Sequence, residues 1–439
     1  MIPCGVLCDK QAPGYARKRI AAELAQSKYQ SRFIDTTTAS PWRECYSPDH
    51  PLTRTESKQY KMELLKVVSE ECLKLLEDAG CTVDRKQSIA KIPGNLVEEA
   101  ISKAKKNITL CARNPKNDVV LDGRRTFCCT DGNGTSVMDF ETGKRRMSTS
   151  KDLAMVGKVA NALDSAHIFW PCISCQDIPD YYRHVADLKV ALMSIEKHVQ
   201  VETTSHRREA QWLVKLGTAL AGDEKSLRRR PIFSSMHCPF SPLQLDGGST
   251  EGALALARAG VPISFYGMPQ AGITGPVTLA GSIIVNNAEV LGGLTMAQLA
   301  APGSPFMYGT GGAAFDMKTM TWAGGGPERA LISAGAGELA HFYGFPILCG
   351  GIVTSAKVPG PQSCYEKMSS GLPQFYAGCD MVAGLGLLGP SQHRPQVGEE
   401  TGIGGRVGAG RAPDRLLVDR NDLVQLVDAV DGGMGPGPL

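Results

Sequence analysis

The chain has 439 residues, of which 42% are hydrophobic and 21% are charged, and its net charge is +3 at pH 7. This size fits one large barrel with additions or two to three smaller domains, and the weak charge argues against nucleic acid or an acidic membrane as a partner. No run approaches the roughly 20 apolar residues of a membrane span, and residues 1–10 lack an apolar signal core, so we expect a cytoplasmic protein.

The first part of the chain is mixed in charge and shows little periodicity, which predicts an irregular extension over residues 1–55. Apolar residues then recur at helical spacing from 56 to 79, and Gly80 is a typical helix end. A second helical pattern covers 93–105, and short alternating runs follow it. Together these features predict a small N-terminal α+β cap over residues 56–125.

From residue 126 onward, short apolar runs alternate with helical patterns, as in a parallel α/β sheet. The eight strand candidates are 127–130, 168–174, 198–203, 231–236, 262–267, 305–310, 346–350 and 380–384. The seven helical patterns between them are 150–163, 185–194, 207–221, 249–258, 277–299, 327–343 and 362–376. Eight such units approach the roughly 250 residues of a closed barrel, so we expect an α/β fold of the (β/α)8 TIM barrel type over residues 126–388. An open doubly wound sheet is the alternative.

The same lead-in precedes two of these strands, because Gly260 and Gly344 each stand two residues before a proline. Glycine ends the preceding helix, and proline begins a strand at a position where no ladder donor is needed. The repeated lead-in supports the barrel.

The glycine-rich segments do not predict a nucleotide site. The turns at 309–312 and 324–326 permit close backbone approach, but neither has the spacing of a phosphate-binding loop. Residues 389–439 are rich in Gly, Arg and Pro without a hydrophobic period, which predicts an irregular tail. The glycine cluster at 402–410 belongs to this tail and is expected to be flexible.

Fourteen cysteines are scattered through the chain and are expected to be reduced, buried side chains. One pair, Cys172 and Cys175, has the C-x-x-C spacing. We place this pair on a strand, where side chains three residues apart point to opposite faces and do not readily reach one ion. No metal site is therefore expected.

In a TIM barrel the reacting groups follow the carboxyl ends of the strands. Polar residues at those positions are Asp131, Asn133, Gln176, Asp177, Glu202, Thr203, His237, Tyr266, Gln270, Thr274, Tyr308, Thr310, Thr354, Ser355 and Lys357. The set contains no Ser/His/Asp triad spacing and no zinc-binding H-E-x-x-H pair. Aromatic rings and carboxylates suit a charged ammonium group in a dry pocket. The structural alternatives are rim packing for each tyrosine and a salt bridge for Glu202.

Several segments resemble one enzyme family. They are 266–281 (YGMPQAGITGPVTLAG), 286–294 (NNAEVLGGL), 305–310 (PFMYGT), 349–357 (CGGIVTSAK) and 362–367 (QSCYEK). These segments are similar to the middle of trimethylamine:corrinoid methyltransferases, and the likeness covers roughly residues 56–388.

The resemblance implies a methyltransferase barrel whose mouth docks a separate corrinoid protein. No cofactor is bound directly; the partner carries the corrinoid (cobalamin), whose Co(I) attacks a methyl carbon of a small methylated amine. The namesake enzymes carry pyrrolysine, thought to activate a tertiary amine, whereas this sequence contains no non-standard residue. A quaternary amine such as glycine betaine, carnitine or proline betaine is then favoured, because its nitrogen is already charged.

On this interpretation Tyr266 and Tyr308 flank the ammonium group, and Glu202 balances its charge. Gln270 and Thr274 orient the polar end of the donor. A carboxylate on the donor would pair with Lys357 or His237, and the two threonines that complete the expected substrate-binding set are Thr310 and Thr354.

Two alternatives remain at this point. One is another TIM-barrel enzyme, of the lyase or aldolase type, with Lys357 forming an imine. The other is an inactive relative that only binds a ligand or the corrinoid protein. By analogy alone, such barrels also form homo-oligomers.

Overall fold

The computed structural model describes residues 70–86, 88–139, 141–318, 321–356, 360–386 and 402–403. The expected extension over 1–55, Lys357 and all but two residues of the expected tail lie outside the described residues. None of the described helices combines the length and apolar character needed to cross a membrane.

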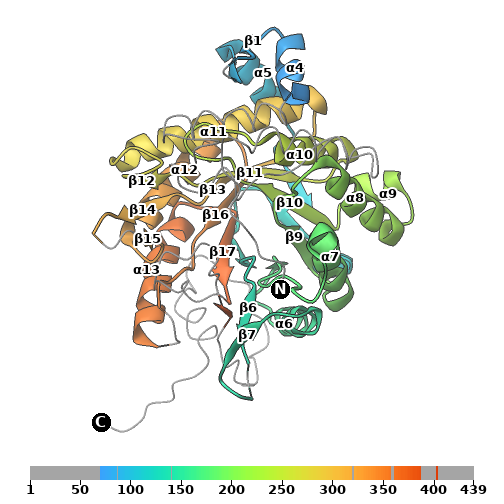
Figure 1. Cartoon of the computed structure of the whole chain (residues 1–439), viewed down its shortest axis with the longest axis vertical. Coiled ribbons are helices and arrows are strands. Elements are labelled where there is room, and N and C mark those ends of the chain that lie inside the picture. Colours follow the sequence, from blue (N-terminus) through green and yellow to red (C-terminus); the bar gives the residue numbers. More distant parts are fainter. Residues whose placement is uncertain are drawn as a thin grey trace, which may run out of the picture.

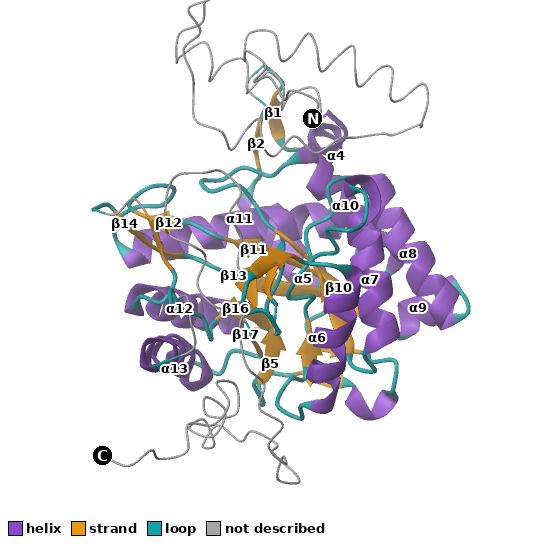
Figure 2. Cartoon of the chain, turned by 60° about the horizontal axis from the view of Figure 1, so that its bottom comes forward, coloured by secondary structure: helices purple, strands orange, loops and turns teal. Residues whose placement is uncertain are grey.

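Eight parallel strands close into a barrel at the centre of the molecule (Figure 1), with helices around it (Figure 2). Each strand pairs with the next along the chain, and the last pairs with the first. The closed ring confirms the predicted TIM barrel over the open sheet. The strands are β5 (Phe127–Thr130), β8 (Ile168–Phe169), β9 (His198–Val201), β10 (Phe233–His237), β11 (Ile263–Gly267), β13 (Phe306–Thr310), β16 (Ile347–Gly350) and β17 (Met381–Leu385).

The helices follow the predicted pattern closely. The two predicted glycine ends are confirmed, since Gly260 and Gly344 adopt left-handed backbone with φ of 81° and 78°. The helices around the barrel are α6 (Ser150–Ala162), α7 (Arg183–Ser194), α8 (Arg207–Ala221), α9 (Glu224–Arg229), α10 (Gly247–Ala259), α11 (Leu279–Ala300), α12 (Pro327–Tyr343) and α13 (Pro361–Tyr376). Two single 3-10 turns occur at Pro115–Asn117 and Asp180–Tyr182.

Side chains on each strand alternate between two buried layers. One layer fills the space between barrel and helices, and the other fills the lumen. On β11, for example, Phe265 packs toward the helices and Tyr266 packs in the lumen. This alternation follows from the two-residue period of a strand.

A hairpin closes the amino end of the barrel. Its strands, β3 (Ile108–Leu110) and β4 (Val119–Leu121), pair antiparallel. Their apolar side chains pack in the lumen against residues such as Phe127 and Met381. The lumen is therefore sealed by apolar groups at one end, and a ligand can enter only from the carboxyl end.

Short strands that the sequence did not predict stand in the loops at the carboxyl end. Each has two to four residues, too few to show a period. One group is β6 (Ser136–Met138), β7 (Arg145–Met147) and β18 (Gly402–Ile403); the other is β12 (Gln270–Ala271), β14 (Ala313–Asp316) and β15 (Thr321–Ala323). Because β18 pairs with β6, the expectation of a flexible glycine cluster is wrong for its first two residues.

The first part of the expected cap that the structure describes, before the β3–β4 hairpin, lies beside the barrel (Figure 1). Helix α5 (Gly94–Lys103) packs on α11, and α4 (Glu70–Asp78) packs on α10 and α11. Strands β1 (Thr82–Asp84) and β2 (Ile89–Lys91) form an antiparallel pair beside α4.

The C-x-x-C pair is not on a strand, so its expected location is wrong. Strand β8 ends at Phe169, and Cys172 and Cys175 follow in the loop. Both are buried, and burial raises the pKa of Cys172 to about 12. The thiol of Cys172 is therefore neutral near pH 7.

Two adjacent glycines on α11 provide a test of the packing between helix and barrel. A Cβ on Gly293 would overlap the ring of Phe265, whereas a Cβ on Gly292 would meet only Leu245 at 3.9 Å. We expect Gly293→Ala to lower the free energy of unfolding by about 1–3 kcal/mol through overpacking. Gly292→Ala should raise it by up to about 1 kcal/mol through helix propensity. Denaturant unfolding measures both, and equal effects would contradict the packing described.

Candidate active site at the barrel mouth

Four side chains turn into the lumen where the strands end. Asp131 follows β5, Trp170 follows β8, Glu202 follows β9, and Tyr266 lies on β11. Trp170 and Tyr266 belong to the lumen layer, with exposures of 2% and 5%. The two carboxylates are partly buried and form the upper level of the same mouth.

Trp170 joins the acidic and the aromatic sides of this mouth. Its indole Nε1 donates a hydrogen bond of 2.9 Å to Glu202 Oε1. Its ring meets the ring of Tyr266 edge to face, with centroids 6.4 Å apart. A Cβ on Gly132 would lie 2.6 Å from the indole nitrogen, so only glycine leaves room there. The result is an aromatic corner that carries a carboxylate at its edge.

Both carboxylates titrate close to neutrality. Burial, helped by the charge of Asp131, raises the pKa of Glu202 to about 7. Burial also raises the pKa of Asp131 to about 6, although the cation of Arg329 opposes the shift. A bound cation would lower both pKa values, because it favours the charged forms.

A histidine stands behind Glu202. His184 Nδ1 lies 2.6 Å from Glu209 Oε1, and this carboxylate overcomes the effect of burial and raises the pKa of His184 to about 9. A cavity of about 10 Å³ is lined by His184, Asn133 and Glu202 among others. The histidine cation lowers the pKa of Glu202 from this side.

Arg329 enters the mouth from the first turn of α12. It is 3% exposed, and its Nε donates to Gly350 O at 3.2 Å and its Nη1 to Gly311 O at 3.4 Å. The guanidinium also stacks on the ring of Trp322, 4.9 Å from the centroid. A permanent cation therefore lies close enough to Asp131 to lower the pKa of that carboxyl.

Sulfur atoms line a third side. Cys238 Sγ lies 3.3 Å from Met236 Sδ and 3.8 Å from Met268 Sδ. Burial raises the pKa of Cys238 far above its usual value, so the thiol is neutral. These soft, polarisable groups suit contact with methyl groups.

Tyr308 does not belong to this mouth, so its expected place beside Tyr266 is wrong. It is fully buried on the helix side of β13. Its hydroxyl donates to Asn287 Oδ1 at 3.0 Å and accepts from Asn286 Nδ2 at 3.3 Å. Both partners lie on α11. The two-residue period assigns Met307, rather than Tyr308, to the lumen.

The same reason removes His237 and Thr310 from the expected binding set. Both are fully buried. The ring of His237 lies between Ser235 Oγ at 3.1 Å and Ser249 Oγ at 3.3 Å, and Ser249 belongs to α10. Burial lowers the pKa of His237 to about 3, so it is neutral and cannot pair with a carboxylate. Thr310 lies on the Tyr308 face of β13.

Three other expected residues stabilise loops. Thr274 Oγ1 accepts from the backbone N–H of Gln270 at 2.9 Å, which closes the turn after β11. The Gln270 side chain donates weakly to Met268 O at 3.5 Å, so it lies near the mouth. Thr354 Oγ1 donates to Glu366 Oε2 at 2.7 Å. Lys357 lies outside the described residues.

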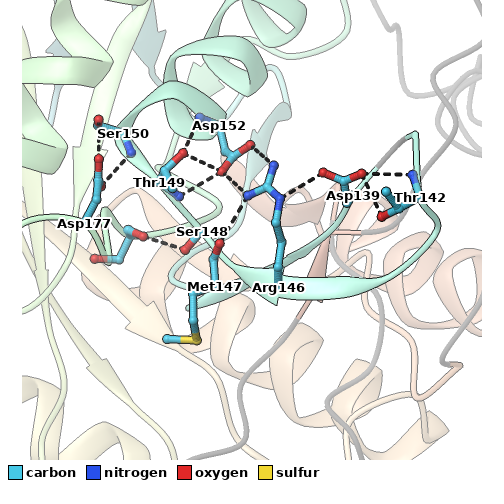
Figure 3. Close-up of polar contacts among 10 residues, drawn as sticks. Asp139, Thr142, Arg146, Met147, Ser148, Thr149, Ser150, Asp152 and Asp177 are labelled. Carbon is cyan, nitrogen blue, oxygen red and sulfur yellow. Dashed lines mark hydrogen bonds and ion pairs between the residues drawn. The ribbon is translucent and has the colours of Figure 1, made fainter.

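The β6–β7 hairpin forms one part of the rim (Figure 3). Arg146 binds Asp152 of α6 through two hydrogen bonds of 2.7 and 2.8 Å and contacts Asp139 at 2.9 Å. Asp152 also accepts from the backbone N–H of Thr149 at 2.8 Å, which completes the cap of α6. A bidentate pair of this kind fixes geometry as well as charge. It therefore fixes the β6–β7 hairpin to the first turn of α6.

Sequence reasoning missed Trp170 and Arg329. The signal for Trp170 was present, since it shares the parity of Ile168 on the second strand and so faces the lumen. Arg329 carried no such signal, because it reaches the mouth from a helix.

Comparison with known proteins gives a consistent family. A family model described as trimethylamine methyltransferase (MTTB) matches residues 62–386. The trimethylamine methyltransferase MttB of Desulfitobacterium hafniense (strain DSM 10664 / DCB-2) is 36% identical over 324 residues, covering 74% of this chain and 65% of that protein. MttB of Methanosarcina thermophila is 32% identical, covering 83% and 72%. A glycine betaine methyltransferase of Desulfitobacterium hafniense (strain Y51) is 30% identical, covering 72% and 68%. The chain spans about two thirds of the length of these relatives.

The raised pKa of Glu202 makes a prediction about stability and pH. Because its folded-state pKa of about 7 exceeds the unfolded value of 4.5, the folded protein holds the proton more tightly, and stability falls as the pH rises through this window. Glu202→Gln removes this loss. We expect the variant to gain melting temperature relative to the parent chain between pH 4.5 and 7, measured by calorimetry across that range.

Glu366→Gln is the matched control. Hydrogen bonds from Gln362, Thr354 and Ser355 outweigh burial and lower the pKa of Glu366, so its carboxylate stabilises the fold above pH 4.5. Relative to the parent chain, this variant should have a lower melting temperature by an amount that stays constant between pH 4.5 and 7. The same pH trend for both variants would contradict the environment described for Glu202.

Proposed function

The chain belongs to the trimethylamine methyltransferase family, and we propose that it transfers a methyl group from a small quaternary amine to the Co(I) of a corrinoid carried by a partner protein. The observation that carries this proposal is the mouth in which Trp170, Tyr266 and Glu202 meet. Aromatic faces and a carboxylate recognise a cation that has no N–H to donate.

The donor class follows from the chemistry of the leaving group. A tertiary amine must be activated before it can lose a methyl group, whereas a quaternary amine already carries the full charge and departs as a neutral amine. The described mouth contains two carboxylates, neutral thiols and one arginine. A quaternary amine leaves without being protonated, so none of these groups has to act as a proton donor. The groups in the mouth therefore agree with a quaternary amine as the methyl donor.

The chain's own residues bind and orient the donor. The rings of Trp170 and Tyr266 flank the ammonium group, and Glu202 balances its charge. Met268 and Cys238 pack on the methyl groups and exclude water. Much of the ammonium charge is still present at the transition state, so these contacts stabilise the bound donor and the transition state to a similar degree. Rate acceleration then comes from alignment and from the dry surroundings.

The corrinoid enters as the methyl acceptor, which attacks the methyl carbon in line with the departing nitrogen. The mouth is the open end of the lumen, so the partner must approach the loops after the strands. Those loops expose apolar side chains that suit a protein contact, namely Met138, Met147, Leu243, Ile273 and Met317.

The direct test is methylation of free Co(I)-cobalamin, followed by absorbance with a panel of quaternary amines. Methyl transfer with one donor class is expected. Binding of donors without any spectral change would instead indicate a relative that binds without turnover.

Substitution of Trp170 tests the cation site itself. Because a desolvated cation–π contact contributes about 2 kcal/mol, we expect Trp170→Leu to raise KM for the donor roughly 30-fold and leave kcat nearly unchanged. Trp212→Leu, at a half-exposed tryptophan on α8, is the matched control and should change neither constant. A fall in kcat without a change in KM would argue against an ammonium contact at Trp170.

A further inference from the structure

Arg329 is a buried cation in the mouth that forms no ion pair within 4 Å with a carboxylate in the part of the chain that the structure describes. Arg329 is 3% exposed, and within the described part of the chain it bonds only to the carbonyl oxygens of Gly350 and Gly311. No ion pair joins it to a described carboxylate. Both bonds are long, and they use Nε and Nη1. A buried guanidinium without a counter-ion is costly, so a missing anion is indicated.

A second hydrogen-bond donor, the hydroxyl of Tyr266, lies beside Nη2 of Arg329, the guanidinium nitrogen that makes no hydrogen bond to a described residue. A Cβ on Gly350 would overlap both Arg329 Nη2 and Tyr266 Oη, so the two atoms lie together over this glycine. Among the described residues, no group accepts a hydrogen bond from either atom. Burial raises the pKa of Tyr266 well above its usual value, so its hydroxyl keeps the proton and remains a donor. Two hydrogen-bond donors therefore converge on one small volume without an acceptor.

We propose that Arg329 Nη2 and Tyr266 Oη bind a carboxylate carried by the methyl donor, so that the donor is a zwitterion. This inference rests on the proposed function, which places the ammonium group at Trp170 and Glu202. Tyr266 connects the two ends, since its ring edge meets Trp170 and its hydroxyl reaches Arg329. The donor's two charges are then only a few bonds apart.

The charges in the mouth favour a zwitterion over a simple cation. Arg329 lies close enough to Asp131 to lower the pKa of that carboxyl, and the charge of Asp131 in turn raises the pKa of Glu202. A simple cation would be balanced by the acids but would leave Arg329 unpaired and repel it. A zwitterion pairs with both walls and adds no net charge. This assigns to Arg329 the role expected for Lys357 or His237.

Arg329 could instead serve only to hold the two glycine carbonyls in place. That structural role predicts an equal loss for every donor. The carboxylate role predicts a loss only for donors that carry an anion. Glycine betaine and choline separate the two roles, because both carry a trimethylammonium group and choline has a hydroxymethyl group in place of the carboxylate.

The experiment measures KM and kcat for both donors with Co(I)-cobalamin as acceptor, and dissociation constants by calorimetry. We expect the parent chain to prefer glycine betaine. Arg329→Gln should weaken glycine betaine binding about 10- to 100-fold, the usual loss for a charged hydrogen bond, and change choline binding less than about threefold. Arg329→Lys should restore part of the affinity. Arg258→Gln, at an exposed arginine on α10, is the control.

Gly350→Ala provides an independent variant, because its Cβ displaces Arg329 Nη2 and Tyr266 Oη without changing either residue. It should reproduce the selective loss of glycine betaine. The same comparison with proline betaine and its hydroxymethyl analogue covers a larger donor. An equal loss for both members of each pair, a preference for the hydroxyl members, or no binding of any of the four would overturn the inference.

The two proposals fail differently. If no donor methylates Co(I), the proposed function fails, but the calorimetric preference for the carboxylate and its loss in Arg329→Gln would still support the anion subsite. If choline is demethylated as well as glycine betaine and Arg329→Gln has no selective effect, the subsite is wrong while the methyl transfer stands.

Discussion

The strands of the closed barrel turn alternate side chains toward the lumen and toward the helices, and this alternation decides which groups can meet a ligand. Glu202 and Tyr266 fall on the lumen side of β9 and β11, whereas Tyr308 falls on the helix side of β13. A rotamer change cannot exchange these sides. A shift of register by one residue would move every side chain of a strand to the other layer, at the cost of both cores.

The lumen changes in character from one end to the other. Apolar side chains of the β3–β4 hairpin seal the amino end. A neutral polar layer follows, in which Ser234 Oγ donates to Gln200 Oε1 at 2.6 Å and lies 2.8 Å from His198 Nε2. The described carboxylates and the arginine of the mouth lie at the carboxyl end. Water has no route through the sealed floor, so the acids and Arg329 act in surroundings of low polarity, where their effect on a ligand is largest.

The sequence predicted the barrel because the residues that begin and end its helices and strands act locally. Glycine ends a helix and proline begins a strand wherever they stand, so all eight strands were found. Their ends lie within two residues of the predicted ones, except that the strand predicted over 168–174 ends at Phe169. The site was harder to predict. Position at the end of a strand was enough to identify Glu202 and Tyr266. To place Tyr308, the face of β13 on which each residue lies also had to be known. Arg329 depends on the entry angle of α12, which no local pattern carries. The short rim strands have two to four residues each, too few to show a period in the sequence.

The glycines of the mouth explain how so many large groups fit into one small volume. Each main group lies where a neighbouring residue has no side chain: Trp170 over Gly132, Tyr266 over Gly311, and Arg329 over Gly350. In the sequence, the glycine-rich turn at 309–312 permits close backbone approach but lacks the spacing of a phosphate-binding loop. In the structure, its role is clearance, because a Cβ at Gly311 would overlap the Tyr266 ring. The glycines therefore determine how far the rings of Trp170 and Tyr266 lie from the buried guanidinium, and in the proposed binding mode this distance sets the length of the donor.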